Sequence, residues 1–303
     1  MAVTQKKPER HSHWIYDNGD AGACGQASAL FPYWSFTKTV IAIIALKLVE
    51  RGVITLDDPL EGKPYSLRQL LNHTAGIADY TSLREYRQAV HNDEEPWPQD
   101  VPLRAVDAQG PLFAPGCGWS YSNTGYMLAR NHIEARSGQD FSALFHELIH
   151  IPLGLEAVSL ATTRADFAPV HWKAATHYHP GWVYHGCLMG TARDAALILH
   201  ALFCGKLLRP ASLTQMLSHH PLGGAIKGRP WTECGYGLGV MSGRVGEAGR
   251  AIGHSGGGPF CVNAVYHFPD GERPVTVASF TDGHNEGVAE FEVVRLAHNH
   301  TYR

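Results

Sequence analysis

Residues 35–52 read SFTKTVIAIIALKLVERG, and the fold prediction starts from this stretch. From Val40 onward its side chains are apolar on almost every side, so a helix formed here cannot face water. Two adjacent charged side chains, Glu50 and Arg51, occur only at its end. Gly52 follows them and can adopt the left-handed backbone conformation that often ends a helix. We therefore predict a buried helix over 35–52.

The first turn of this helix holds Ser35 and Lys38, three residues apart and so on one face. A serine hydroxyl is a weak nucleophile until a base takes its proton, and a lysine buried against apolar side chains can lose its own proton and act as that base. Backbone N–H groups at the helix start can receive a developing oxyanion. Because S-x-x-K patterns occur often by chance, an N-cap serine beside a solvated lysine is the alternative.

Composition narrows the class of protein. The chain has 303 residues, 44% hydrophobic and 17% charged, which is enough for one large core or two smaller ones. A formal net charge of −3 and the lack of basic runs argue against nucleic acid as a partner. The apolar run 40–46 is too short to span a membrane, and residues 1–14 lack the apolar segment of a secretory signal. We expect a cytoplasmic protein that binds no membrane.

The six cysteines and nineteen histidines do not predict a metal centre. The cysteines are scattered without a C-x-x-C pair, which fits small buried hydrophobes better than a zinc site or a disulfide scaffold. The segments 177–179 and 298–300 each carry two histidines, but no acidic or cysteine partner stands at ligand spacing. We interpret these as surface histidines.

The hydrophobic periodicity changes along the chain. Residues 65–155 are mainly helical in pattern, and a T-x-x-D capping box at 191–194 precedes a short helix over 195–203. Beyond Gly235 the pattern becomes β, with strands predicted over 236–241, 249–254, 260–268 and 274–280 and a closing helix over 286–297. Short turns, including a hairpin at 269–271, make the predicted sheet antiparallel.

Two further motifs follow S-x-x-K. A loop at 115–126, PGCGWSYSNTGY, contains Tyr121-x-Asn123, and His254-Ser255-Gly256 ends a predicted strand. In this order the motifs resemble the S-x-x-K, Y-x-N and (K/H)-(T/S)-G triplet of serine β-lactamases and penicillin-recognising hydrolases, in particular the class C, DD-peptidase and esterase branch. The resemblance covers most of the chain, with matching segments at 46–60, 67–77, 119–128, 189–195 and 236–239.

This resemblance implies catalytic roles. Ser35 would be the acylated nucleophile, and Lys38 would help to remove and return its proton. Tyr121 would be the general base or acid across the cleft, its phenol pKa lowered by Lys38; the alternative for Tyr121 is a core aromatic. The implied reaction is acyl transfer, which needs no metal or organic cofactor.

The resemblance also implies substrate-binding positions. Asn123, His254 and Ser255 would hydrogen-bond the substrate, and Gly256 would let it approach the backbone. The N–H groups of Ser35 and Gly257 would form the oxyanion hole. In this family the last motif lies on the edge strand that lines the cleft. Aromatic and histidine side chains of 180–186 are candidate walls, an ordinary packed loop being the alternative.

The stretch 251–260, AIGHSGGGPF, offers a competing nucleophile, because Gly253-x-Ser255-x-Gly257 matches the elbow of α/β-hydrolases. An elbow serine lies between a strand and a helix, and its acidic and histidine partners come from later βα units. Here a predicted strand follows, and only residues 256–303 remain. We therefore favour Ser35.

The predicted function is that of a serine hydrolase forming an acyl-enzyme with a small ester or amide. His254 stands where class C β-lactamases carry lysine, and a neutral histidine grips a substrate carboxylate less firmly. β-Lactamase, D-Ala-D-Ala carboxypeptidase or D-aminopeptidase activity is the alternative. A non-catalytic binding module on the same fold is the alternative from another class. The oligomeric state is left open.

The implied fold is a mixed α/β (α+β) β-lactamase/transpeptidase-like structure. A discontinuous domain, residues 1–59 and 186–303, would hold an antiparallel sheet flanked by the Ser35 helix and the C-terminal helix. Residues 60–185 would form an inserted, mainly helical domain, with the active site in the cleft between the two. Because only 34 residues precede Ser35, where the family usually has a helix and two longer strands, we expect a shortened sheet on that side.

Overall fold

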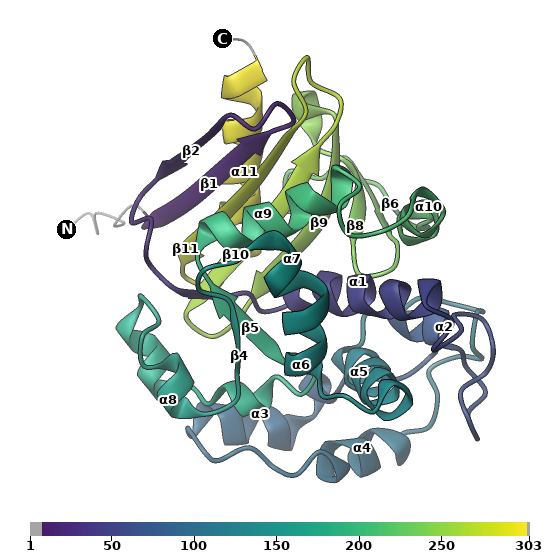
Figure 1. The fold of residues 1–303 in the computed structure, drawn as a ribbon. Coiled ribbons are helices and arrows are strands. Elements are labelled where there is room, and N and C mark those ends of the chain that lie inside the picture. Colours follow the sequence, from purple (N-terminus) through teal and green to yellow (C-terminus); the bar gives the residue numbers. More distant parts are fainter. Residues whose placement is uncertain (1–7, 302–303) are drawn as a thin grey trace.

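The computed structural model describes residues 8–301 and is organised around an eight-stranded antiparallel sheet (Figure 1). The strands are ordered β2-β1-β11-β10-β9-β8-β7-β6. Their bounds are β1 (Arg10–Tyr16), β2 (Ala21–Cys24), β6 (His220–Gly223), β7 (Glu233–Tyr236), β8 (Met241–Arg244), β9 (Arg250–Gly257), β10 (Cys261–Phe268) and β11 (Val275–Asp282). The predicted antiparallel sheet with a β10–β11 hairpin is confirmed.

Helices cover both faces of this sheet (Figure 1). The helix α11 (Glu286–Thr301) packs on β9, β10 and β11 from one face, and α1 (Phe36–Glu50) and α9 (Ala192–Phe203) pack from the other. Side chains of β10 alternate between the two faces, since Ala264 and Tyr266 join the apolar cluster under α11 whereas Val265 joins the cluster around α1. Both faces are therefore buried, and both flanking helices are as predicted.

The segment between α1 and α9 is mainly helical, as predicted. It contains α2 (Leu67–Leu71), α3 (Arg84–His91), α4 (Asp100–Asp107), α5 (Asn123–Ser137), α6 (Phe141–Phe145), α7 (Ile151–Leu153) and α8 (Arg164–Phe167). Short 3₁₀ turns in this segment occupy 80–82, 173–177 and 180–182, and a π turn occupies 146–150. A further 3₁₀ turn at 246–248 lies outside the segment, between β8 and β9. A small sheet joins β4 (Ser159–Ala161) of this segment to β5 (Cys187–Gly190), which precedes α9, and β5 to β3 (Phe31–Pro32), which precedes α1.

The division into domains at 59/60 and 185/186 stays a prediction. One apolar cluster takes side chains from both predicted domains, for example Ile43 of α1 and Leu70 of α2. The termini of the predicted first domain, 1–7 and 302–303, lie outside the described residues, as do the side chains of 299 and 300 in the second histidine segment.

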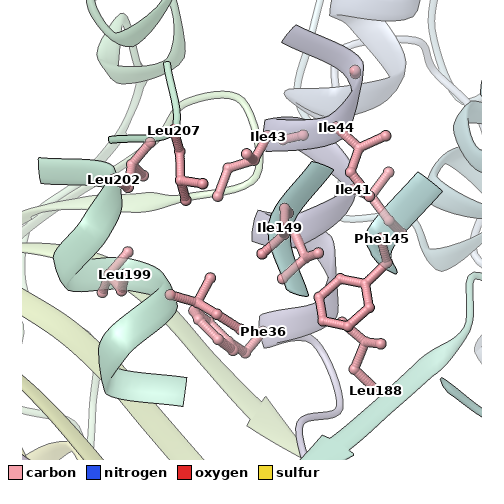
Figure 2. Packing of buried hydrophobic residues seen from close by; sticks show 14 of the residues in the cluster. Phe36, Ile41, Ile43, Ile44, Phe145, Ile149, Leu188, Leu199, Leu202 and Leu207 are labelled. Atoms are coloured by element: carbon pink, nitrogen blue, oxygen red, sulfur yellow. The ribbon is translucent and has the colours of Figure 1, made fainter. Parts of the chain in front are cut away.

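The helix α1 is the centre of the apolar core. Its side chains from Phe36 to Leu46 are all buried, and the chain leaves it through Gly52 at φ +72°, as predicted. Figure 2 shows Ile43 on the side of α1 toward α9, while Ile41 and Ile44 lie on the side of Phe145. The helix therefore links the sheet side of the molecule to the helical side.

Two local predictions are wrong. Residues 237–240 form a turn between β7 and β8 rather than part of a strand, and the Gly237 N–H donates to the Val240 carbonyl. The Thr191 side chain accepts from the Asp194 N–H, so that α9 begins at Ala192 and not at residue 195. The capping box is only half formed because the Asp194 carboxylate accepts from the Ala157 N–H.

The N-terminal side of the sheet holds two strands. β1 pairs with β11 over its seven residues, and the turn at 17–20 leads into β2, which adds four more. Within residues 8–301 no helix precedes α1. On this N-terminal side, only the outer strand β2 is short.

We expect Ile43→Ala to lower the free energy of unfolding by about 2–5 kcal/mol, because Ile43 is fully buried and its truncation leaves a cavity. Urea denaturation followed by circular dichroism measures this. Leu112→Ala is the matched control, since Leu112 is 53% exposed and should change stability by less than about 0.5 kcal/mol. Equal effects of the two substitutions would contradict a core centred on α1.

Candidate active site

Ser35 occupies the N-cap position of α1, but its side chain does not cap the helix. Its Oγ lies 3.0 Å from the Lys38 Nζ and accepts a 2.9 Å hydrogen bond from the Tyr121 hydroxyl. The structure thus brings these three predicted residues together. The alternative of an N-cap serine beside a solvated lysine is wrong.

The residue before the serine holds it in place. Trp34 has φ +45°, a backbone region that is costly for a bulky side chain. Its indole is buried among aromatic rings, including Tyr178 and Phe260, and its N–H donates to the Cys261 Sγ at 3.3 Å. The packed indole offsets the backbone cost and fixes the turn that presents Ser35.

The Lys38 amine is fully buried at the first turn of α1. Burial lowers its pKa to about 7, against the opposing effects of the Asp79 and Glu286 charges. The Nζ also lies 5.1 Å from the centre of the Tyr121 ring. Near neutral pH a large fraction of Lys38 is therefore an uncharged amine with a lone pair.

The pKa of Tyr121 contradicts one expectation. Burial raises the pKa of this phenol well above 10, and the hydrogen bond to Ser35 opposes that rise only in part. The expected lowering by Lys38 is therefore wrong, and Tyr121 is a neutral phenol whose hydroxyl points at Ser35. Its position suits a proton donor, and the alternative of a core aromatic is wrong as well.

Asn123 begins α5 and lies between the Lys38 amine and the Asp79 carboxyl group. Its Oδ1 accepts from the Lys38 Nζ at 2.7 Å, and its Nδ2 donates to the Asp79 Oδ2 at 2.9 Å. The second Nδ2 hydrogen is left for a substrate. The sequence reasoning missed Asp79. Its Oδ1 accepts from the Thr81 N–H, so Asp79 also caps the 3₁₀ turn at 80–82, and this capping pattern is the local feature of the sequence that could have drawn attention to it.

The end of β9 carries the third motif. Residues 250–253 pair with β8, whereas 254–257 pair only with β10. β9 is thus an inner strand whose last four residues have a free edge, which corrects the expectation of an edge strand. Neighbouring side chains alternate between the two faces of the sheet.

His254 lies on the Tyr121 side of β9. Its Nε2 shares a 2.8 Å hydrogen bond with the Tyr236 hydroxyl, and only 2% of the residue is exposed. Burial, with the nearby Lys38 charge, lowers its pKa to about 3. His254 is therefore neutral and supplies no positive charge to the site.

Ser255 lies on the opposite face of the sheet. Its Oγ donates to the Glu290 Oε1 of α11 at 2.5 Å and is hydrogen-bonded to the Tyr266 hydroxyl at 2.8 Å. The expectation that Ser255 binds substrate is therefore wrong. The competing elbow nucleophile is wrong too, because β9 continues through Gly258 into the strand β10 rather than into a helix.

Gly256 allows a close approach, but the approaching group is not a substrate. A Cβ at this position would lie 2.9 Å from the Ser35 nitrogen and 2.9 Å from the Tyr33 carbonyl oxygen. Only glycine lets the end of β9 lie against the backbone that presents Ser35. The expected contact of Gly256 with substrate is corrected accordingly.

Ser35 opens into a pocket of about 110 Å³. Gly257 lines the same pocket, so the two predicted oxyanion-hole residues lie at one cavity. The predicted wall at 180–186 is confirmed for Trp182, Val183 and His185. The other lining residues are Trp34, Tyr80, Thr81, Tyr86, Asn123, Tyr178 and Gly258.

A second hollow of about 440 Å³ meets this pocket at Gly257 and Gly258. Its remaining lining is polar and consists of Lys227, Arg229, His284, Asn285 and Glu286. Arg229 is already paired with Glu286 at 3.0 Å and with Glu290. Gly257 and Gly258 thus lie between an aromatic and a polar compartment.

Two buried histidines lie near Lys38 and its partner Tyr121. The sequence reasoning missed His73 and predicted His185 only as a wall residue of the cleft. The His185 Nε2 lies 3.2 Å from the Lys38 Nζ. The His73 ring centre lies 4.3 Å from that of Tyr121, and its Nδ1 accepts from the Ser122 N–H. Neither carries a motif of its own, since their proximity to Lys38 and Tyr121 arises from the tertiary fold.

One cluster within residues 8–301, made of Glu9, His11 and His171, could hold a metal ion by proximity. The His11 Nδ1 accepts a hydrogen bond from the Gln26 N–H, so the proton of the neutral ring is on Nε2, which faces Glu9. A metal on that nitrogen would displace the proton and oppose the Gln26 contact. The cluster is better described as a hydrogen-bonded link between the N-terminal strand and residue 171.

The family model described as Beta-lactamase matches residues 1–299. Penicillin-binding protein 4* of Bacillus subtilis is 25% identical over 273 residues, covering 77% of this chain and 57% of that protein. Esterase EstB of Burkholderia gladioli is 29% identical over 201 residues, covering 57% of this chain and 49% of that protein. The chain thus spans about half the length of these relatives.

Among solved structures, the D-amino acid amidase of Ochrobactrum anthropi SV3 superposes with a TM-score of 0.79 at 22% identity, covering 96% of this chain and 94% of that one. The predicted β-lactamase/transpeptidase-like fold is therefore confirmed. In the described part of the chain, no helix has the length and apolar character needed to cross a membrane.

We expect Asp79→Ala to lower kcat/KM for an ester substrate about 100-fold, because the freed Asn123 amide no longer holds the Lys38 amine in place. Steady-state kinetics measure this loss. Asp140→Ala is the matched control, since Asp140 caps α6 through the Ala143 N–H away from the site. It should cost about 1 kcal/mol of stability and leave kcat/KM unchanged. The same kcat/KM for both variants would show that Asp79 acts only as a cap.

Proposed function

The chain belongs to the Beta-lactamase family, and on that premise we propose that it is a serine hydrolase that forms an acyl-enzyme on Ser35 from a small ester or amide. The observation that carries the proposal is the grouping of a hydroxyl with a base and an acid. The Ser35 Oγ lies 3.0 Å from the Lys38 Nζ and 2.9 Å from the Tyr121 hydroxyl. Such a grouping is what a nucleophilic serine requires.

In the acylation step, neutral Lys38 takes the Ser35 proton while the Oγ attacks the substrate carbonyl carbon. The resulting oxyanion lies against the N–H groups of Ser35 and Gly257, each contributing about 3 kcal/mol or more. As the tetrahedral intermediate collapses, the Tyr121 hydroxyl protonates the leaving group and regains a proton from the Lys38 ammonium. Both proton carriers are then ready for the second step.

In deacylation the same groups act on water. Neutral Lys38, now beside the ester oxygen of Ser35, accepts a proton from the attacking water, and the acid product leaves as the Ser35 oxygen is protonated again. The scheme uses Tyr121 as a donor, in accord with its raised pKa. It also requires Lys38 to be uncharged at the start of each step.

The pH dependence follows from the pKa of Lys38. Below a pKa of about 7 the amine is an ammonium and cannot accept the Ser35 proton, so the rate should rise with pH through that value. His254 stays neutral across this range because its pKa is about 3. The acid limb of the rate profile therefore belongs to Lys38.

The pocket supports a neutral acyl group. All of its lining residues lie in the described part of the chain, and none is charged: five are tryptophan or tyrosine, and His185 is neutral because burial lowers its pKa. A β-lactam carries a carboxylate that needs a cation, and neither His254 nor the pocket supplies one; Lys227 and Arg229 line only the adjoining hollow. These features favour an ester or amide with an uncharged, aromatic or small acyl group over a β-lactam substrate. The similarity to an esterase agrees with this choice.

We expect one covalent adduct when the protein is treated with a fluorophosphonate, and no adduct on the Ser35→Ala variant. Ser255→Ala is the matched control and should still be labelled, because its side chain lies on the α11 face of the sheet. Intact-protein mass spectrometry measures both. An adduct that survives Ser35→Ala but is lost in Ser255→Ala would overturn the assignment of the nucleophile.

A substrate comparison then separates the remaining functions. p-Nitrophenyl esters, D-amino-acid amides and a chromogenic cephalosporin are compared by kcat/KM on one preparation. The proposal expects the esters or amides to exceed the cephalosporin. The reverse order would favour a β-lactamase, and neither labelling nor turnover would favour a binding module.

A further inference from the structure

The Lys38 amine has three polar neighbours, and they differ in what they can do. Asn123 presents its Oδ1 at 2.7 Å and His185 presents its Nε2 at 3.2 Å, while Ser35 presents its hydroxyl at 3.0 Å. The Asn123 oxygen faces Lys38 because its nitrogen is held by Asp79. Of the three neighbours, only the hydroxyl both donates and accepts regardless of tautomer.

An uncharged amine has two N–H groups and one lone pair. If the Asn123 Oδ1 and the His185 Nε2 each accept one N–H, the lone pair points at the remaining neighbour, which is the Ser35 hydroxyl. We propose that His185 is a positioning residue that, together with Asn123, directs the lone pair of Lys38 at the Ser35 proton. This inference rests on the proposed function, because it assigns His185 a part in activating Ser35.

The proposed role requires one tautomer of His185. To accept from Lys38, the ring must carry its proton on Nδ1, and that atom is buried without a hydrogen-bond partner among the described residues. The Trp34 carbonyl is near enough to raise the pKa of the ring slightly but is not placed to accept in good geometry. A buried donor left unpaired costs about 1–3 kcal/mol.

The ring also remains an acceptor throughout the working pH range. His185 is 2% exposed, and burial, with Lys38 and Arg130 nearby, lowers its pKa well below 6.5. It therefore stays neutral and does not store the Ser35 proton. The other titratable groups around Lys38, none of which has a hydrogen bond to the Nζ among the described residues, are Asp79, Glu286, Cys187, His73, His254, Tyr121 and Tyr126.

Two substitutions separate positioning from packing. His185→Leu keeps much of the side-chain volume but removes the acceptor, and His185→Gln restores an acceptor. We expect His185→Leu to lower kcat at least about tenfold with little change in KM, and His185→Gln to recover most of that loss. The acid limb of kcat/KM should move to lower pH in His185→Leu, because the Lys38 ammonium loses an acceptor that stabilised it.

The matched control is His267→Leu. His267 is also a buried histidine, with its Nδ1 hydrogen-bonded to the Thr276 hydroxyl and its ring stacked on Phe203, but it does not line the pocket. It should lose stability and leave the acid limb unmoved. Equal rate losses in His185→Leu and His185→Gln with an unmoved acid limb would overturn the proposal in favour of packing.

The tautomer of His185 can also be measured directly, without any turnover, so the proposal can be tested even if the His185 variants fold poorly. ¹⁵N NMR of histidine-labelled wild-type protein at pH 7.5 should show His185 as a single tautomer protonated on Nδ1, and Lys38→Met should release it to a mixture. A wild-type ring protonated on Nε2 would overturn the proposal even if Ser35 is labelled. If Ser35 is not labelled while the predicted tautomer is seen, the proposed function fails and the Lys38 contact stands.

Discussion

The structure depends on one buried amine. Lys38 sits in the first turn of a helix whose side chains are covered on every side, so its charge has no access to water. The same burial that makes α1 the centre of the core lowers the pKa of Lys38 to about 7. The stability of the fold and the reactivity of the serine thus have a common physical origin.

An amine in this position needs partners, and two of its three come from distant parts of the chain. Asn123 begins α5 and His185 precedes β5, so these two contacts tie the helical side of the molecule to the first turn of the central helix, where Ser35 also lies. Two features near Lys38 lower the stability of the fold: the positive φ of Trp34 and the unpaired Nδ1 of His185. Such costs are typical of functional sites and are offset by packing elsewhere, here by the apolar cluster around α1.

The sequence predicted what local pattern determines. The buried helix and the antiparallel sheet follow from periodicity and turn patterns, whereas the meeting of Ser35 with Tyr121 was implied by the family resemblance of the three motifs. Ser255 was placed at the site by its motif, although the alternation of a strand already sets it on the face opposite to its neighbours. The pKa of Tyr121 was misjudged because burial outweighs the nearby amine, and burial is a property of the whole fold. Asp79 was not found, and His185 was predicted only as a wall residue of the cleft, since only tertiary packing brings Asp79 to Asn123 and His185 to Lys38.

The most direct test of the central claim is the titration of Lys38 itself. In protein labelled with [ε-¹³C]lysine, with the signal assigned by its loss in Lys38→Met, the chemical shift is followed by NMR from pH 5 to 11. The account predicts a midpoint near pH 7. A Lys38 signal that stays in the charged form up to about pH 10, as for a lysine in water, would contradict it.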